Sequence, residues 1–471
     1  MVPRFKFFSI LLFYLIIFLF PSCQGNQEKS IADKDPPENI SFSTEELKRR
    51  TFHFFWDLAY ENNLQIPDRH PTLRFSSIAG TGFGFTAYLI GAENGYISRT
   101  EAAGRTLETL RILSALPQGP DSSGVSGYKG FFYHFLTIDQ ALRYKNVELS
   151  SIDTGLLMAG ILSAIQYFNK KNPEEQEIRL LGDALFRRVE WDWMYVNDGK
   201  LSMGWRPERG YIPSSWDGYN EAMILLIMAL GSPTHPIADD AWKGWTSTYE
   251  WGTFQGRDYL QFSPLFGHQY SHMYIDFRGI QDDYMREKGI DYFENARRAT
   301  LANRDYCLEN PNKFRGYGAN QWGLTACDGP AGMDTVWNGN PLRFMTYSAR
   351  GASALRVRDD GTIAPTAAGG SVPYAPDECL AALKYMWENN YENLIGEYGF
   401  KDAFNLSFTF TEDTKTDGWF DHDYLGIDQG PILIQLENHE TEFVWNLMKK
   451  NPYIIEGLKK AGFKGGWLEE L

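Results

Sequence analysis

Apolar residues recur along this chain with the spacing of α-helices, and the pattern predicts two kinds of helix. Segments 77–92, 151–168 and 222–230 are apolar almost throughout, which is typical of helices buried on all sides. Segment 174–190 mixes charged and apolar residues at helical spacing and predicts a half-exposed helix. Weaker helical patterns are found at 43–58, 98–113, 237–249, 283–309, 376–388, 428–449 and 452–461.

This alternation predicts an all-α fold in which buried inner helices are paired with amphipathic outer ones. A closed ring of such helical hairpins is an (α/α)6 barrel, and we expect residues 41–471 to form one domain of this kind. A two-layer α-solenoid is the alternative, although the sequence contains no repeat of fixed period. Small β-hairpins are expected in the loops, at 130–136 with 142–146 and at 195–204.

The N-terminus has a different pattern. A short basic start precedes an apolar run from Phe7 to Phe20, which is shorter than the roughly 20 residues of a membrane-spanning helix and typical of a signal peptide. The Pro-Ser-Cys that follows resembles the lipobox of bacterial lipoproteins, which implies cleavage before Cys23 and lipid attachment to its sulfur. We therefore expect a signal peptide at 1–22 and a polar tether at 23–40. An ordinary signal peptide with an incidental cysteine is the alternative.

These features predict an exported protein that is held at a bacterial membrane, expected to be the outer membrane, by its N-terminal lipid alone. The net charge of −15 argues against binding of a nucleic-acid backbone or of anionic lipid headgroups. Three further cysteines, Cys307, Cys327 and Cys379, are too few for a disulfide framework or a zinc pattern, although one disulfide is left open. No nucleotide-binding or metal-binding motif is found, so neither a cofactor nor a metal is expected, and we expect a monomer.

Carboxylates near aromatic residues, at the starts of apolar helices, are the candidate chemistry. Glycoside hydrolysis requires one carboxyl group that is held protonated and another that is ionised to activate water or attack. Glu221 ends the string S-S-W-D-G-Y-N-E and precedes a very apolar helix, where apolar surroundings raise a carboxyl pKa as a general acid requires. The alternative is a glutamate that only interacts with the helix dipole.

Other carboxylates are candidates for the second role. Glu148 and Asp153 lie in V-E-L-S-S-I-D-T-G-L-L, at the start of another apolar helix, where Asp153 falls inside the apolar pattern. Asp428 precedes the last strongly apolar helix. Capping or pairing at the helix ends is the alternative role for each of them. Asp153 and Asp428 are therefore both candidates for the catalytic base, and Glu148 is a candidate for substrate binding.

Aromatic residues make up 15% of the chain, which suits stacking on sugar rings but also suits a large core. The residues expected to contact sugar, besides Glu148, lie in loops that combine aromatic and polar side chains. They are Lys129, His134, Arg206, Trp216, Asp217, Tyr219, Asn220 and Trp322.

Several strings together resemble the glucoamylase-like domain of glycoside hydrolase family 144. They are F-W-D with I-P-D-R, S-I-A-G-T-G-F-G-F-T-A-Y, I-S-R-T-E-A-A, P-Q-G-P, G-Y-K-G-F-F-Y-H-F-L, E-L-S-S-I-D-T-G-L-L and S-S-W-D-G-Y-N-E-A-M. The resemblance extends over residues 45–450 and is strongest over 52–235.

The resemblance implies an (α/α)6 barrel that hydrolyses β-1,2-glucans or β-1,2-oligoglucans with inversion. Cleavage would be endo, or exo with release of the disaccharide sophorose. It also implies that Glu221 is the acid, while Asp153 and Asp428 stay open as bases. Two rival functions are an α-glucan exo-hydrolase on the same barrel and a non-catalytic glycan-binding lipoprotein. The expected partner is a neutral glucan or oligosaccharide in each case.

Overall fold

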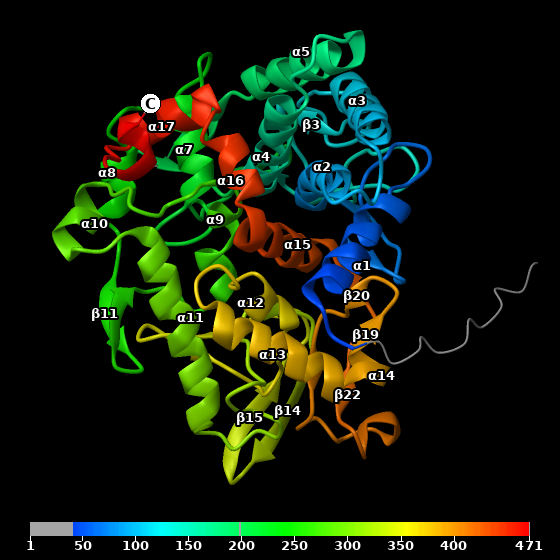
Figure 1. Cartoon of the computed structure of the whole chain (residues 1–471), viewed down its shortest axis with the longest axis vertical. Helices are drawn as coiled ribbons and strands as arrows, with labels where there is room; N and C mark the ends of the chain where they lie inside the picture. Colours follow the sequence, from blue (N-terminus) through cyan, green and yellow to red (C-terminus); the bar gives the residue numbers. More distant parts are fainter. Residues whose placement is uncertain (1–40, 197–198, 471) are drawn as a thin grey trace, which may run out of the picture. The chain divides into compact units, whose positions relative to one another are not determined.

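Helices supply most of the regular structure in the computed structural model, which describes residues 41–196 and 199–470 (Figure 1). The longer helices are α1 (Thr44–Asp57), α2 (Ile78–Glu93), α3 (Arg99–Ala115), α4 (Ser151–Tyr167), α5 (Pro173–Arg188), α7 (Met223–Gly231), α11 (Tyr292–Glu309), α13 (Pro376–Asn389), α15 (Gly426–Thr441) and α17 (Pro452–Lys460). The shorter ones are α6 (Trp191–Met194), α8 (Ala241–Thr246), α9 (Tyr270–Tyr274), α10 (Asp283–Lys288), α12 (Pro365–Gly369), α14 (Tyr391–Leu394) and α16 (Phe443–Met448). The proposed signal peptide, the tether and Cys23 lie outside the described residues.

The strands are short and pair antiparallel. One three-stranded sheet has the order β10 (Gly210–Tyr211), β9 (Gly204–Arg206), β6 (Leu149–Ser150). The two-stranded pairs are β1 (Arg69–His70) with β23 (Tyr424–Leu425), β2 (Ser76–Ser77) with β5 (Phe135–Leu136), β3 (Gly127–Tyr128) with β4 (Phe131–Phe132), β7 (Tyr195–Val196) with β8 (Lys200–Leu201), β11 (Trp251–Phe254) with β12 (Arg257–Leu260), β13 (Ala326–Cys327) with β16 (Ser348–Ala349), β14 (Met333–Trp337) with β15 (Asn340–Phe344), β17 (Gly351–Ala352) with β18 (Val357–Arg358), β19 (Ile395–Gly396) with β20 (Gly399–Phe400), and β21 (Phe404–Asn405) with β22 (Trp419–Phe420).

The predicted alternation of buried and half-exposed helices is confirmed. Almost every residue of α2, α4, α7 and α15 is buried, whereas α1, α3, α5 and α13 bury one face. The buried helices pack in sequence, α2 on α4, α4 on α7, α7 on α9, α9 on α15, and α15 back on α2. Figure 1 shows α1, α3, α5 and α13 on the periphery of this group.

Three inner helices begin directly after a short strand, and this arrangement fixes where their N-termini lie. Strand β2 leads into α2, β6 into α4 and β23 into α15. Ser77 and Ser150, at the ends of β2 and β6, cap their helices by accepting a hydrogen bond from the backbone N–H three residues later. Side chains in the first turns of α4 and α15 therefore face a region lined by strand pairs rather than by other helices.

The closest approach of α2 and α4 depends on two glycines. A Cβ added at Gly160 would lie 2.0 Å from the carbonyl oxygen of Gly82, and one added at Gly82 would lie 2.5 Å from the carbonyl oxygen of Leu156. No side chain fits at either position without a shift of backbone. The two inner helices can therefore pack backbone to backbone.

We expect Gly160→Ala to lower the free energy of unfolding by about 3 kcal/mol, because the added methyl group must push α2 away from α4. Gly104→Ala is the matched control, since Gly104 lies inside α3 and a Cβ there meets nothing within 4 Å. That substitution should stabilise the protein by roughly 0.5–1 kcal/mol through helix propensity. Chemical denaturation of the two variants measures both effects, and equal midpoints would contradict the packing argument.

Some sequence predictions are corrected by the structure. The segment 283–309 is two helices, α10 and α11, because Gly289 takes a left-handed conformation with φ of 71°. Glu442, with φ of 57°, ends α15 in the same way and separates it from α16. Residues 142–146 form no named strand, although Arg143 forms an antiparallel bridge with Leu136 and the backbone N–H of Tyr144 donates to Phe135; the strand paired with β5 is β2. Strands β7 and β8 pair as the turn signal predicted, although residues 197–198 of that turn are not described.

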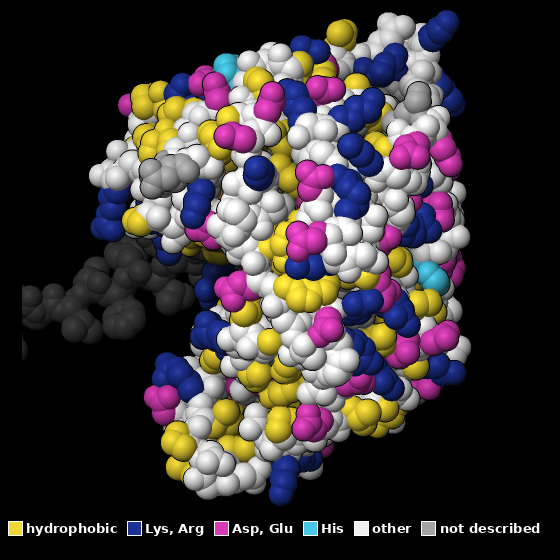
Figure 2. All heavy atoms as spheres, turned by 90° about the vertical axis from the view of Figure 1, so that its left-hand side faces the viewer, with side chains coloured by type: hydrophobic (Ala, Val, Ile, Leu, Met, Phe, Trp, Pro, Cys, Tyr) yellow, Lys and Arg dark blue, Asp and Glu magenta, His cyan; other side chains and the backbone are white. Residues whose placement is uncertain are grey.

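Cys307, Cys327 and Cys379 are free and buried, so the disulfide left open by the sequence is not formed. None of the helices within residues 41–196 and 199–470 is both long and apolar enough to cross a membrane. Figure 2 shows acidic and basic side chains interspersed over the face that it presents.

Candidate active site

A cavity of about 260 Å³ lies where the strand pairs meet the N-termini of the inner helices. Its wall combines residues from the start of α4, the β1–β23 pair and the β2–β5 pair. The charged and aromatic side chains that line it are Asp68, Arg69, Phe75, His134, Phe135, Asp153 and Tyr347. Of the candidates from the sequence, His134 and Asp153 line this cavity, whereas Glu221 and Asp428 do not.

Glu221 lies just before α7 and is half-buried. Its Oε2 atom is buried and has no hydrogen-bond partner. Burial is the main cause that raises the pKa of Glu221 to about 7, and the negative charge of Asp153 raises it further. The carboxyl group can therefore hold a proton near neutral pH, which is the property that the sequence predicted for a general acid.

Asp153 forms part of a chain of charged groups at the start of α4. Its Oδ1 lies 3.5 Å from Nε2 of His134, and its Oδ2 contacts the hydroxyl of Ser150. Nδ1 of His134 lies 3.1 Å from Oε1 of Glu148, and the guanidinium of Arg206 donates to Oε2 of Glu148 at 2.9 Å. Both oxygens of Asp153 therefore have polar partners.

The charges in this chain stabilise one another. Burial lowers the pKa of His134, but the charges of Asp153 and Glu148 outweigh burial and raise it to about 9. The hydrogen bond from His134 is the main cause that lowers the pKa of Glu148 to about 2. His134 is thus a cation between two carboxyl groups at neutral pH.

Arg69 holds a second group of carboxylates on the opposite side of the cavity. Its Nε donates to Asp68 at 3.0 Å and its Nη1 donates to Asp328 at 2.5 Å, while Asp423 lies 3.9 Å from Nη1. Asp423 in turn accepts a hydrogen bond from the backbone N–H of Thr72. The guanidinium of Arg69 therefore lies near three aspartates, of which Asp328 and Asp423 are far from it in the sequence.

Asp402, Asp421 and Asp428 extend this acidic group into the interior. Each is at most 4% exposed, and each has one buried carboxylate oxygen without a hydrogen-bond partner. Burial raises the pKa values of Asp421 and Asp428 to about 7 and that of Asp402 well above its usual range. Contact with the Asp402 carboxyl group opposes part of the increase at Asp428. The N-cap position of α15 is taken by Leu425, so Asp428 does not serve as that cap.

Two tyrosines, Tyr270 and Tyr347, lie near the acidic residues described above. Burial raises the pKa of the Tyr270 hydroxyl well above its usual value, and charges on Asp428, Glu221 and Asp153 contribute. The Tyr270 hydroxyl is therefore influenced by the charges of Glu221, Asp153 and Asp428. Tyr347 lines the cavity and is 52% exposed, so its ring is accessible to a ligand.

Several predicted sugar contacts are corrected. Trp322 is fully buried in the second core cluster, and Tyr219 is 2% exposed and stacked on Tyr292, so neither ring offers a face to a ligand. Asn220 uses its side chain to order the turn before α7, and the buried indole of Trp216 donates to Ser151. These aromatic and amide side chains support the loop around Glu221 rather than line the cavity.

Two charged candidates are paired at positions that do not line the cavity. Lys129 forms an ion pair with Glu190, and Asp217 forms one with Lys200 at 2.6 Å. Arg206 reaches the site only through Glu148. Of the predicted sugar contacts, His134 is the one that lines the cavity itself.

Sequence reasoning missed Asp68, Arg69, Asp328, Asp402 and Tyr347. Asp68 and Arg69 belong to the string I-P-D-R, which supports the family resemblance but lies outside the helix starts where carboxylates were sought. The others lie in loops that carry no helical period, and their partners are up to 259 residues away in the sequence, as for Arg69 and Asp328. The signal that could have indicated them is the concentration of aspartate beside aromatic residues in these loops.

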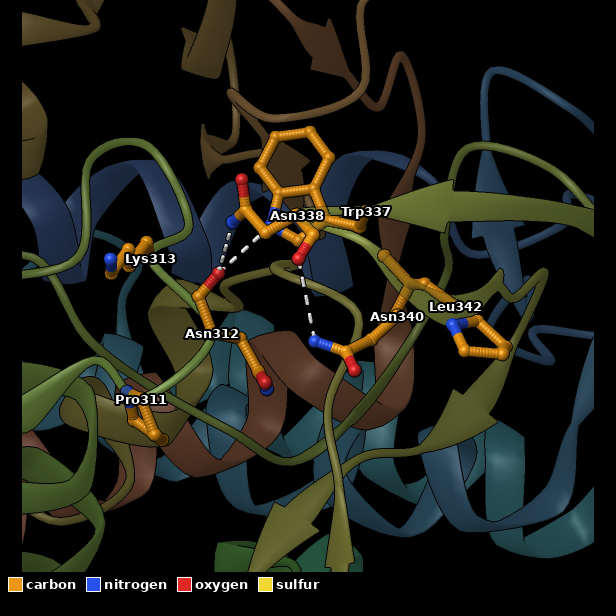
Figure 3. Close-up of a pocket in the computed structure, with 8 residues that line it drawn as sticks. Pro311, Asn312, Lys313, Trp337, Asn338, Asn340 and Leu342 are labelled. Carbon is orange, nitrogen blue, oxygen red and sulfur yellow. Dashed lines mark hydrogen bonds between the residues drawn. The ribbon is translucent and has the colours of Figure 1, made fainter.

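A separate surface pocket of about 210 Å³ lies at the tip of the β14–β15 hairpin (Figure 3). Trp337 and Asn338 both donate to the carbonyl oxygen of Asn312 at 2.9 Å. Its lining contains asparagines, prolines and one lysine but no carboxylate. It can provide neither a general acid nor a base, whereas the cavity beside Asp153, the candidate active site, is lined by the carboxyl groups of Asp68 and Asp153.

The model of the Glycoamylase family, which covers glucoamylase-like proteins, matches residues 213–452, a segment that contains Glu221, Asp402 and Asp428. A solved structure of a glucoamylase-like protein from Bacteroides uniformis is 33% identical, with a TM-score of 0.78 over 91% of this chain and 100% of that one. The chain belongs to glycoside hydrolase family 144. Its fold is accordingly glucoamylase-like.

Two relatives of this family-144 chain have descriptions of their activity. An exo β-1,2-glucooligosaccharide sophorohydrolase acting at the non-reducing end, from Parabacteroides distasonis, is 29% identical over 93% of this chain. The chain spans 60% of the length of that protein. The endo-β-1,2-glucanase of Chitinophaga pinensis, solved with sophorotriose and glucose, is 28% identical, with a TM-score of 0.77 over 91% of this chain and 100% of that one.

Proposed function

We propose that this chain hydrolyses β-1,2-glucans or β-1,2-oligoglucans, with Glu221 as general acid. The observation that carries the proposal is the buried Oε2 of Glu221, which has no hydrogen-bond partner, together with a pKa of about 7. A carboxyl group in this state can protonate a leaving oxygen at neutral pH. The linkage follows from the two family relatives whose described substrates are β-1,2-linked.

Asp428 is the base in this proposal, and Asp153 has a different role. Both oxygens of Asp153 have polar partners, and its charge raises the pKa of Glu221, so it keeps the acid protonated. Asp428 has a buried oxygen without a partner and a pKa of about 7, which is well matched to accepting a proton near neutral pH.

The reaction is a single displacement with inversion. Glu221 gives its proton to the glycosidic oxygen while the bond from that oxygen to C1 breaks. A water molecule forms the new bond to C1 from the opposite face, and Asp428 takes its proton. The exposed ring of Tyr347 provides a stacking surface, and the carboxylates around Arg69 accept hydrogen bonds from sugar hydroxyls.

We also propose that the helices close into an (α/α)6 barrel, which the cyclic packing of α2, α4, α7, α9 and α15 supports. Export as a lipoprotein anchored at Cys23 stays part of the proposal. Labelling of the full chain with a fatty-acid analogue, compared with a Cys23→Ala variant, tests the anchor.

Product analysis tests the proposed function. A form of the protein that begins after Cys23 is incubated with linear β-1,2-glucan, short β-1,2-oligomers and starch. We expect cleavage of a β-1,2 substrate, and the size of the first products separates endo from exo action. Cleavage of starch alone would assign an α-glucan hydrolase, and binding without cleavage would end the enzyme proposal.

The pH dependence of kcat/KM should show the influence of Asp153 on the acid. Wild-type kcat/KM is expected to fall above about pH 7, because Glu221 must be protonated to act. In Asp153→Asn the neighbouring negative charge is lost, so the pKa of Glu221 falls and the alkaline limb moves to lower pH. Glu148→Gln is the control, because it changes the same histidine without removing the charge beside Glu221. An alkaline limb that does not move in Asp153→Asn would contradict this role.

A further inference from the structure

Asp402 and Asp428 face each other in the interior with no cation assigned to them. The two carboxyl groups are in hydrogen-bonding contact. Oδ1 of Asp402 and Oδ2 of Asp428 are both buried and lack any donor from another residue. Among the described residues, no lysine or arginine forms an ion pair with either one, since Arg69 is used by Asp68 and Asp328.

Two ionised carboxylates in contact in such a place would repel each other strongly, because the interior screens charge poorly. A single proton between them removes the repulsion and makes a short, charge-assisted hydrogen bond. The remaining question is which of the two residues holds that proton when the site is ready to react.

The surroundings assign the proton to Asp402. Its other oxygen, Oδ2, accepts a hydrogen bond of 2.7 Å from the backbone N–H of Asp328, which fixes the orientation of the carboxyl plane; this bond lowers the pKa of Asp402, but burial and nearby negative charges outweigh it. Asp402 is 2% exposed and has three acidic neighbours in Asp428, Asp328 and Asp421, so its ionised form is the more strongly opposed. Asp428 is close enough to Arg69 for that cation to favour its ionised form.

We propose that Asp402 is a positioning residue that keeps its proton and donates it in a hydrogen bond to Asp428, and so orients the catalytic base. The proposal rests on the function proposed above and adds a residue that no part of that function required. In this arrangement Asp402 does not touch the substrate. It holds one oxygen of Asp428 so that the other oxygen faces the attacking water.

Asparagine and leucine at position 402 separate this role from the alternatives. In Asp402→Asn the amide oxygen can accept from the N–H of Asp328 and the amide nitrogen can donate to Asp428, so the orientation of the base is kept. Leucine has a similar size but can do neither. We expect kcat of Asp402→Asn to stay within roughly tenfold of wild type, whereas Asp402→Leu loses about 100-fold, the cost of a misplaced group. If Asp402 were instead the ionised base, Asp402→Asn would be as inactive as Asp428→Asn, and the proposal would be overturned.

A stability measurement tests the protonation of Asp402 without any substrate. The folded-state pKa of Asp402 lies above its unfolded value, so the stability due to its neutral form is present at low pH and is lost as pH rises through the folded pKa. The amide that replaces this carboxyl group in Asp402→Asn stays neutral, so the melting temperature of the variant should rise relative to that of wild type as pH increases above the usual pKa range of an aspartate. The other titratable and charged groups that face the pair are present in both proteins; they are Asp68, Arg69, Tyr270, Cys327, Asp328, Tyr347 and Asp421.

The melting experiment also separates a proton from a metal ion. Carboxylate oxygens of Asp328, Asp402 and Asp421 lie within 4.8 Å of one another, a spacing that a cation could also use. Calcium chloride and EDTA are therefore added to wild type and to Asp402→Asn. The proposal predicts no shift with either reagent and a pH-dependent difference between the two proteins. A calcium-dependent rise in the melting temperature of wild type alone, or parallel pH profiles of the two proteins, would overturn the proposal even if wild type cleaves β-1,2-glucan. Inactivity of wild type on every glucan would refute only the proposed function.

Discussion

Glu221→Gln is expected to lower kcat on a β-1,2-glucan substrate by about 10³-fold or more, with little change in KM. Glutamine has nearly the same shape and can occupy the same position before α7, but it cannot transfer a proton to the leaving oxygen. The loss should appear in the chemical step, because the leaving sugar must then depart as an alkoxide. Steady-state kinetics on a single defined oligomer measures both parameters.

The nature of the leaving group provides the internal control for this prediction. An aryl β-sophoroside with an acidic phenol needs little protonation, so Glu221→Gln should recover much of its activity on such a substrate if the site accepts it. Glu108→Gln, on the exposed surface of α3, is the matched substitution that should leave kinetics unchanged. A Glu221→Gln enzyme within tenfold of wild type on natural substrate would remove Glu221 from the acid role.

Asp428→Asn should produce a loss of similar size, about 10³-fold in kcat, because no other group is then placed to take the proton of the attacking water. Asp153→Asn should cost much less and act mainly through the pH profile. The comparison decides between the two bases that the sequence left open. A greater loss in Asp153→Asn than in Asp428→Asn would exchange their roles.

Rescue of activity by a small anion tests the assignment of Asp428 as the base in a way that does not depend on the size of the loss in kcat. Azide is already a nucleophile and needs no base, so it should restore part of the activity of Asp428→Ala and form a glycosyl azide. Azide should not restore Glu221→Gln, in which the missing proton belongs to the leaving group. Absence of rescue in a correctly folded Asp428→Ala protein would count against Asp428 as the base.

The sequence indicates the proposed acid more clearly than the proposed base. The environment of the acid is made by residues near it in the sequence, whereas that of the base is made by distant residues. Glu221 could be proposed as the acid from sequence, since its neighbours along the chain create its environment: an aromatic loop before it and the apolar helix α7 after it. Its pKa of about 7 follows largely from that local burial. Asp428 also precedes an apolar helix, but its properties depend on Asp402, Arg69 and other residues from remote loops.

For the aromatic residues predicted to contact sugar, residue type alone did not predict whether the side chain is exposed. Trp322 and Tyr219 have the residue types of a sugar platform, yet both are buried. Aromatic rings gain from burial in a core as they do from stacking on a sugar, so residue type alone does not distinguish the two environments. Tyr347, which carries the exposed ring of the cavity, lies in a loop with no periodic pattern.

The sequence by itself determined the helical class, the alternation of inner and outer helices, their serine caps and the candidacy of Glu221, because each depends on residues within a few turns of one another. Only the tertiary structure decided that Arg69 from β1 neutralises Asp328, that Asp402 faces Asp428, and that His134 lies between Glu148 and Asp153. Such pairs form when the strand-to-helix connections are brought to one place by packing of the inner helices. Ion pairs and shared protons between residues distant in the sequence produce no periodic pattern along the chain. They can be recognised only when the distances between the residues are known.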